Sequence, residues 1–346
     1  MRRSVIVEGD TCWRVAACDE ARVLVDARDY YAAFCRAALR AERSILMSGW
    51  QFDTRMRLLH GADAERAAHP VEFVPFLNFL CERAPSLTVK VMAWDYSTIY
   101  ALEREWMQRW RFEARSHPRV EFAFLAHPVA GGSHHQKYVV IDGAVAFAGG
   151  LDICDARWDS PAHAAHDPDR RDAAGDPAKP FHDVQVALVG EAARALEEMF
   201  AAQWQTASGA PLDLPPAPRE PPAWARLSAL SEDRGHALPV SSVALSRSER
   251  CEGREGVCEV KSLFEAAIAE AERLVYIENQ YFTSRAMLRA LATRMRDRSK
   301  PKLTVVLVMP DGGDFEGGLR PRRPASARCA RRCRRSPSAR GTRCGC

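Results

Sequence analysis

The chain has 346 residues, of which 47% are hydrophobic, a size that suits two domains or one two-lobed domain with a large apolar core. Its formal net charge of +4 is concentrated at one end, because segment 319–346 holds ten arginines and no acidic residue, whereas the rest carries a net charge of −6. A mildly acidic body is not typical of a nucleic-acid-binding groove, and no apolar run reaches the roughly 18–20 residues of a membrane-spanning helix.

Apolar periodicity predicts alternating helices and strands along the first 210 residues. Helices are expected at 29–43, 71–83, 100–115 and 191–206, and strands at 44–50, 87–94, 120–125 and 184–189. Segments 138–141 and 145–148 are expected to form a hairpin, because the Asp142-Gly143 pair between them is a strong turn signal. The polar segment 152–179 is expected to be a long ordered loop. Helices that alternate with strands indicate an α/β fold whose sheet is covered on both faces.

The same order of elements recurs after a Pro-rich stretch. Residues 41–52 align with 271–282, and Leu87-Thr88-Val89 aligns with Leu303-Thr304-Val305. A helix precedes each first segment, and a further helix and strand follow it, which favours internal duplication over coincidence. We therefore predict a first lobe at 1–210, a linker at 211–225, a partial second lobe at 226–318 and an Arg/Cys-rich, disordered tail at 319–346.

The first lobe contains the pattern His135-x-Lys137-x4-Asp142. Residues two apart in an extended chain face the same way, so His135 and Lys137 are expected to project together. A neutral imidazole can attack phosphorus, and a lysine beside it supplies a charge for phosphate oxygens, so no metal is required. A His-x-Lys pair alone is a weak signal that also occurs by chance on surfaces. The His134-His135 pair lacks the neighbouring ligands of a zinc site.

A longer pattern makes the assignment more specific. The run His135-x-Lys137-x4-Asp142-x6-Gly149-Gly150-x-Asp152 resembles the HKD signature of the phospholipase D superfamily. The glycine pair fits this pattern, because small residues after the strand allow the backbone to approach a ligand closely. Further segments resemble the bacterial phospholipase D-like and cardiolipin synthase-like branch; they are 48–53, 94–97, 150–159, 180–184 and 276–282. The resemblance extends from about residue 5 to residue 311.

The resemblance implies a phospholipase D-like α/β fold of two duplicated α-β-α lobes, the second of them incomplete here. It also implies hydrolysis or phosphatidyl transfer on phospholipids through a phosphohistidine, without a cofactor. His135 would be the nucleophile or the general acid/base, Lys137 would hold phosphate oxygens, and Asp142 would support the site. Substrate-binding or supporting roles fall on Gly149, Gly150, Asp152, His182, Glu278 and Asn279. A purely structural role is an alternative for His182, Glu278 and Asn279.

The sequence departs from the family pattern because only one histidine, His135, is followed by lysine two residues later. The repeat places a second copy beyond position 346, so we expect a truncated or frameshifted chain with impaired activity. Short relatives with one motif pair two copies, which makes a homodimer one route to a second site. The alternatives are a non-catalytic remnant that binds phosphate or lipid and, less favoured by charge, a nucleic-acid phosphodiesterase. We expect a cytoplasmic protein at the inner face of the membrane. The head group and acceptor are not encoded in recognisable residues.

Overall fold

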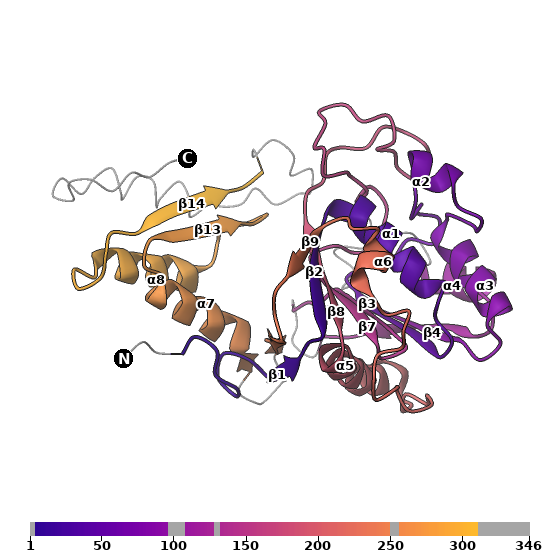
Figure 1. The fold of residues 1–346 in the computed structure, drawn as a ribbon, viewed down its shortest axis with the longest axis horizontal. Helices are drawn as coiled ribbons and strands as arrows, with labels where there is room; N and C mark the ends of the chain where they lie inside the picture. The colour runs from indigo at the N-terminus through magenta and orange to yellow at the C-terminus, as the bar shows by residue number, and fades with distance from the viewer. Residues whose placement is uncertain (1–3, 96–107, 128–131, 250–255, 311–346) are drawn as a thin grey trace. The chain divides into compact units, whose positions relative to one another are not determined.

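The computed structural model describes residues 4–95, 108–127, 132–249 and 256–310. The chain divides into two compact units, a larger one at 16–243 and a smaller one at 1–15 and 244–346 (Figure 1). Residues 100–107 of a predicted helix and the predicted tail at 319–346 lie outside the described residues. No helix in the described ranges is long and apolar enough to cross a bilayer.

The larger unit is built on an eight-stranded sheet with the order β5-β4-β3-β6-β7-β8-β2-β9. Its strands are β2 (Glu20–Val25), β3 (Ser44–Gly49), β4 (Thr88–Trp94), β5 (Val120–Leu125), β6 (Tyr138–Ile141), β7 (Val145–Gly149), β8 (Val184–Val189) and β9 (His236–Leu238). Its helices are α1 (Asp26–Ala38), α2 (Gly61–Glu65), α3 (Phe73–Arg83), α4 (Gln108–Arg115), α5 (Glu191–Ser208) and α6 (Leu227–Ser231). The α/β fold predicted from the sequence is confirmed.

The sheet is mixed in direction. β3, β4 and β5 run parallel, whereas β6 is antiparallel to β3 and continues antiparallel through β7 and β8. The predicted hairpin is confirmed as β6 and β7, and its turn residues Asp142 and Gly143 have φ angles of 54° and 66°. Two residues with positive φ are what a tight hairpin turn requires.

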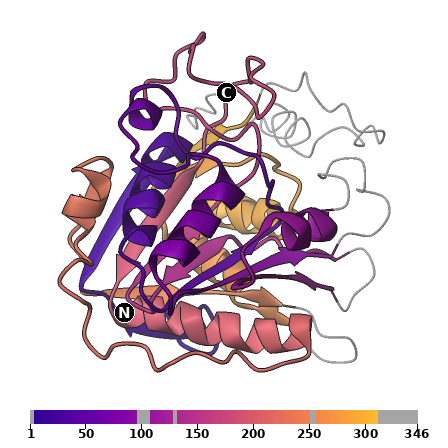
Figure 2. The same ribbon diagram turned by 90° about the vertical axis from the view of Figure 1, so that its right-hand side faces the viewer.

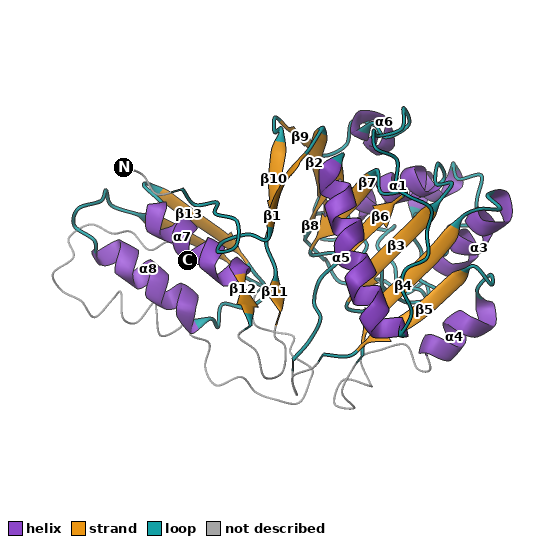
Figure 3. Cartoon of the chain, turned by 90° about the horizontal axis from the view of Figure 1, so that it is seen from below, coloured by secondary structure: helices purple, strands orange, loops and turns teal. Residues whose placement is uncertain are grey.

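Helices cover both faces of the sheet (Figures 2 and 3). On one face, the α5 side chains Phe200 and Trp204 pack against Tyr138 and Lys90 of the sheet. On the other face, Ile45, Met47 and Val89 are fully buried in a core shared with α1 and α3. The strands β3 and β4 are buried along almost their whole length, as expected for parallel strands covered on both faces.

Residues 211–225, where a linker is predicted, lie within the larger unit. Ala225 is buried in the main core, and Trp224 packs against that core. The chain passes between the units at 15–16 and again at 243–244. Strands β1 (Arg14–Ala17) and β10 (Ser242–Leu245) pair at these passages as a separate two-stranded sheet.

The smaller unit contains the second copy of the predicted repeat. Its elements are β11 (Ser248–Glu249), β12 (Val257–Cys258), α7 (Glu259–Glu270), β13 (Leu274–Glu278), α8 (Arg285–Arg296) and β14 (Thr304–Val308). β13 and β14 are parallel, and Leu274 pairs with Thr304 just as Ser44 pairs with Thr88 in β3 and β4. The two strand pairs therefore have the register that the sequence alignment requires.

Backbone hydrogen bonds outside the strands also repeat. Thr88 N–H donates to the carbonyl of Arg43 at 3.1 Å, and Thr304 N–H donates to the carbonyl of Arg273 at 2.8 Å. The aligned residues Phe52 and Phe282 are both buried, at 2% and 6% exposure. Because register, backbone bonding and burial agree at aligned positions, the structure supports an internal duplication.

Candidate active site

The predicted site lies at one edge of the eight-stranded sheet. β6 runs antiparallel to β3 and pairs Tyr138 with Ser48, so the beginning of β6 lies beside the end of β3. β4 is parallel to β3 and ends at the same edge with Trp94. His135 and Lys137 lie in the segment just before β6, which begins at Tyr138 as predicted. The topology thus gathers the chemically active residues where neighbouring strands end.

Lys137 is held by a buried carboxylate. Its ammonium Nζ lies 2.9 Å from Oδ2 of Asp152, and both side chains are about 5% exposed. The same Nζ donates a 3.4 Å hydrogen bond to the carbonyl of His135. The backbone N–H of Trp50 donates to Oδ1 of Asp152 at 2.7 Å, and the Tyr31 hydroxyl donates to the Asp152 carbonyl at 2.6 Å. Asp152 therefore fixes Lys137 beside His135.

The His135 side chain is exposed at this edge and lies beside aromatic rings. The Trp50 ring is 6.0 Å from the His135 ring, and Trp50 stacks on Trp94 at 6.0 Å between centroids. Desolvation lowers the pKa of the His135 imidazole, Lys137 lowers it further, and Asp152 acts in the opposite direction. The ring is therefore neutral at a lower pH than an ordinary histidine, and a neutral ring has the lone pair of a nucleophile.

Asp142 lies at the opposite end of β6 from Lys137, about 17 Å along the chain at roughly 3.3 Å per residue. Its carboxylate accepts backbone hydrogen bonds from Glu42 at 3.0 Å, Arg43 at 2.9 Å and Ser44 at 2.8 Å. These bonds fasten the hairpin turn to the beginning of β3. The structure does not bring Asp142 to the other two motif residues, so its support of the site is structural.

Strand packing requires a glycine at 149, and the Asp183 side chain lies close to Gly150. A Cβ on Gly149 would collide with the carbonyl of Val184 and the side chain of Gln185, and one on Gly150 would collide with the Asp183 carboxylate. Gly149 N–H donates to the Lys137 carbonyl at 3.1 Å. The close approach described at Gly149 is thus to β8, whereas the predicted approach was to a ligand.

His182 pairs with the carboxylate of Asp26 at the beginning of α1. Its Nδ1 lies 2.6 Å from Oδ1 of Asp26. The following residue, Asp183, lies closer to the site: burial raises the pKa of its carboxyl, while a backbone N–H and the charge of Lys137 act to lower it. Glu278 and Asn279 belong to the smaller unit, where both are exposed at and just after the end of β13.

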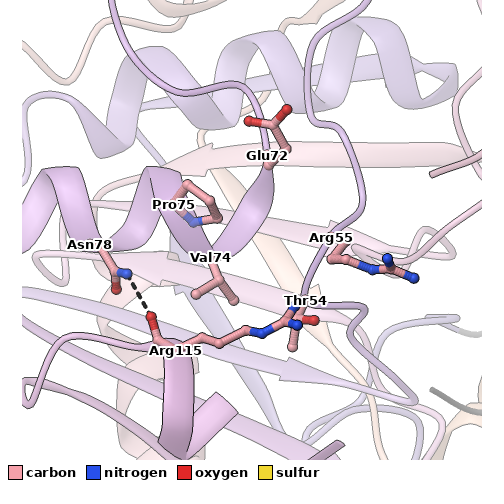
Figure 4. Close-up of a pocket in the computed structure, with 7 residues that line it drawn as sticks. All are labelled: Thr54, Arg55, Glu72, Val74, Pro75, Asn78 and Arg115. Atoms are coloured by element: carbon pink, nitrogen blue, oxygen red, sulfur yellow. Dashed lines mark hydrogen bonds between the residues drawn. The ribbon is translucent and has the colours of Figure 1, made fainter. Parts of the chain in front are cut away.

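Sequence reasoning missed several contacts of the site. Trp50 and Trp94 were noted only within matching segments, although Trp50 directly follows β3 and Trp94 is the last residue of the adjacent strand β4. Their signal was an aromatic residue at the end of a buried strand. Separately, a small hollow of about 130 Å³ lies beside α3 and is lined by Thr54, Arg55, Glu72, Val74, Pro75, Asn78 and Arg115 (Figure 4). It contains none of the predicted site residues.

Comparison with known proteins gives the class to which this fold and site belong. Residues 37–290 match the phospholipase D family. The chain therefore belongs to the phospholipase D family. It is 27% identical to phospholipase D alpha 2 of Oryza sativa subsp. japonica over 316 residues, covering 71% of this chain and 38% of that protein. Phospholipase D1 of Saccharomyces cerevisiae is 24% identical over 310 residues, covering 75% of this chain and 18% of that protein.

The chain thus spans well under half the length of these relatives. Among solved structures, phosphatidylserine synthase of Haemophilus influenzae is similar with a TM-score of 0.49 and 14% identity, covering 85% of this chain and 63% of that one.

Proposed function

We propose that this chain is a phospholipase D-type phosphodiesterase that acts on phospholipids through His135. The observation that carries the proposal is the placement of a buried, carboxylate-held lysine beside an exposed imidazole of lowered pKa, in a chain of this family. The named relatives are phospholipases D, which makes a phospholipid the first substrate to test.

In the proposed reaction, a ring nitrogen of His135 attacks phosphorus and forms a P–N bond while the P–O bond to the leaving alcohol breaks. The alkoxide takes a proton from a general acid. A water molecule, or a second alcohol, then attacks the phosphohistidine, loses its proton to that group and restores the imidazole. The products are an alcohol and a phosphomonoester, or a new diester.

Lys137 would stabilise the phosphate oxygens during both steps. An ammonium has three N–H donors, and in the described structure two of them face Asp152 and the His135 carbonyl. The third is available to an anionic oxygen. Asp152 keeps the buried lysine paired and positioned without substrate, which lowers the reorganisation needed when phosphate arrives.

The proposed reaction also needs a general acid, and the given sequence contains one His-x-Lys pair. General acid–base catalysis contributes about 10²–10⁴-fold to rate. We therefore propose activity lower by about that factor than in an enzyme with two motif histidines, unless a second copy of the chain completes the site. In that case the rate per chain rises with protein concentration.

The test is hydrolysis of a chromogenic phosphodiester by the wild type, His135→Ala and the matched control His134→Ala. His134 is the neighbouring histidine, and its ring faces His127 and the Ala126 carbonyl. We expect weak activity in the wild type and in His134→Ala, and none in His135→Ala. Mass spectrometry of quenched protein should detect, on His135, the phosphoryl group that still carries the second ester substituent of the substrate.

Each result bears on a separate part of the proposal. Activity that survives in His135→Ala contradicts the nucleophile assignment. Robust wild-type activity contradicts the proposed impairment. Phosphate binding without turnover at any concentration would indicate a non-catalytic remnant. Cleavage of DNA in preference to phospholipid vesicles would indicate a nucleic-acid phosphodiesterase, which the net charge of −6 outside 319–346 disfavours.

A further inference from the structure

A second polar cluster, which contains neither His135 nor Lys137, lies where the long loop between β7 and β8 meets the beginning of α1. Asp26 is completely buried, and each of its carboxylate oxygens faces a different imidazole. Oδ2 lies 2.6 Å from Nε2 of His163, and Oδ1 lies 2.6 Å from Nδ1 of His182. The two rings are 4.7 Å apart in an edge-to-face arrangement. Three sequence-distant segments thus bring one carboxylate and two imidazoles together.

The negative charge of the Asp26 carboxylate is not fully balanced by a permanent positive charge in this cluster. A buried carboxylate is normally paired with a cation or bound to a metal. The ion pairs of Asp26 in the described structure are those with His163 and His182, and imidazoles carry charge only when protonated. The Asp183 backbone N–H, at 3.3 Å, is a further weak donor. When the rings are neutral, the cluster holds a buried negative charge and two nitrogen donors.

We propose that Asp26, His163 and His182 form a binding site for one divalent transition-metal ion, with zinc as the best fit. The ligand atoms of the three residues all lie within 4.8 Å of one another. Two imidazoles and one carboxylate, with water in the fourth position, are a common tetrahedral zinc set with bonds of about 2.0–2.2 Å. The site differs from the His135 group in residues and does not depend on the proposed function.

Two of the three proposed ligand residues have a backbone conformation with positive φ, as is common for residues at functional sites. Asp26 has a φ angle of 60° and His163 one of 46°, a left-handed conformation that costs energy for residues other than glycine. The half-exposed rings of His163 and His182 leave room for small rotations, which would open the present 2.6 Å nitrogen–oxygen contacts to the spacing that a bound ion needs.

An ion at this position would connect the long loop to the sheet. His163 belongs to the loop that starts after β7, His182 lies two residues before β8, and Asp26 begins α1. The same loop carries Asp152, which pairs with Lys137. Metal binding would therefore restrict the segment that positions the lysine of the proposed active site.

The test is zinc binding to the metal-free full chain, measured by equilibrium dialysis for the wild type, His163→Ala and His182→Ala. The matched control is His166→Ala, an exposed histidine of the same loop outside the cluster. We expect both cluster variants to bind one ion fewer than the wild type and the control. Their affinity at this site should fall by at least about 100-fold, because even groups that only orient ligands contribute about 10–100-fold.

Cobalt provides a spectroscopic readout that excludes the cysteines. The difference between wild-type and His163→Ala spectra should show tetrahedral d–d bands without thiolate-to-cobalt charge transfer. Zinc should also raise the midpoint of thermal unfolding of the wild type more than that of His163→Ala. Equal ion stoichiometry in the wild type and both cluster variants overturns the proposal, as does a cobalt difference spectrum dominated by thiolate bands.

Discussion

The strand pairs β3–β4 and β13–β14 share register and helical flanks, yet they differ in burial. Every residue of β3 is buried, whereas Leu274 and Tyr276 of β13 are 56% and 55% exposed. Among the described residues of the smaller unit, one hydrophobic cluster is built on the buried side chains of Ile268, Phe282 and Leu291. Strand direction and register thus follow from the local helix–strand–helix–strand sequence, which both copies have. Burial follows from neighbours supplied by distant segments.

The neighbours that make the difference can be named. β3 lies between β4 and β6, and the hairpin turn of β6 and β7 is fastened to it by Asp142. Among the described strands, β13 pairs with β14 alone. Parallel strands are seldom stable when exposed on their faces. We therefore expect substitutions at aligned positions to have unequal costs.

The largest effect is expected for Asp142→Ala, which removes the contact that fastens the hairpin turn to the beginning of β3. Three backbone N–H groups of residues 42–44 would lose a charged acceptor, and alanine is also strained at a φ angle of 54°. We expect destabilisation of the larger unit by about 3–4 kcal/mol. Urea unfolding followed by tryptophan fluorescence measures it.

The matched control for this change is Asp172→Ala. Asp172 accepts backbone bonds from Ala174 and Asp176 in a loop, both at 2.9 Å, but those amides are exposed and can bind water instead. The control should cost less than about 1 kcal/mol. Equal losses in the two variants would contradict the role of Asp142 as the fastening of β3.

A smaller effect is expected for the same substitution at two aligned positions, Val89→Ala in β4 and Val305→Ala in β14. Val89 is fully buried, so losing two methyl groups should cost about 2–3 kcal/mol, whereas the half-buried Val305 should lose about 1 kcal/mol or less. Hydrogen exchange of the amides in each strand reports the local opening free energy. If the two variants lose the same amount, burial does not distinguish the two copies.

The smallest effect is expected from removing the charge of Lys137, which lies just before β6 and beside the end of β3. In Lys137→Gln, one of the influences that lower the pKa of His135 disappears while Asp152 stays, so the pKa should rise toward that of an ordinary histidine. As the pH is lowered, the neutral form of the ring would then be lost at a higher pH than in the wild type. Any activity that depends on the neutral ring would be lost over the same higher pH range. NMR titration of the His135 ring measures the shift.

Lys90→Gln is the control for this experiment. Lys90 is as buried as Lys137, at 8% exposure, and pairs with Glu121. It lies toward the beginning of β4, away from the edge where His135 lies. The His135 titration should therefore be unchanged in Lys90→Gln. A shift of the same size in both variants would show that net charge, not the neighbouring ammonium, sets the pKa.

Local patterns were sufficient to predict much of the fold. Strands 120–125 and 184–189 were predicted to the residue, because each is a short apolar run between polar segments. The hairpin followed from Asp142-Gly143, and the repeat predicted the register of β13 with β14. Strand β2 was not predicted, since its position in the sheet depends on antiparallel pairing with β8, more than 150 residues away.

The site was predictable as a set of residues but not as a geometry. The motif identified His135, Lys137 and Asp152, yet nothing in the spacing shows that Asp152 pairs with Lys137. The glycine pair was assigned to ligand approach, because the sequence does not reveal that β8 passes against it. The pairing of His182 with Asp26 joins positions 156 residues apart. Such contacts are set by tertiary packing, which a single sequence does not encode in short patterns.

The four residues between Lys137 and Asp142 are β6 itself. The spacing of the motif therefore corresponds to the length of one strand, with the lysine that pairs with Asp152 before it and the aspartate that anchors the hairpin turn after it. Inserting a single residue within 138–141 would preserve every side chain named in the motif. It would still turn alternate residues to the opposite face and move Lys137 away from Asp152. Engineering of this enzyme class can exchange side chains within β6 but has to keep its length.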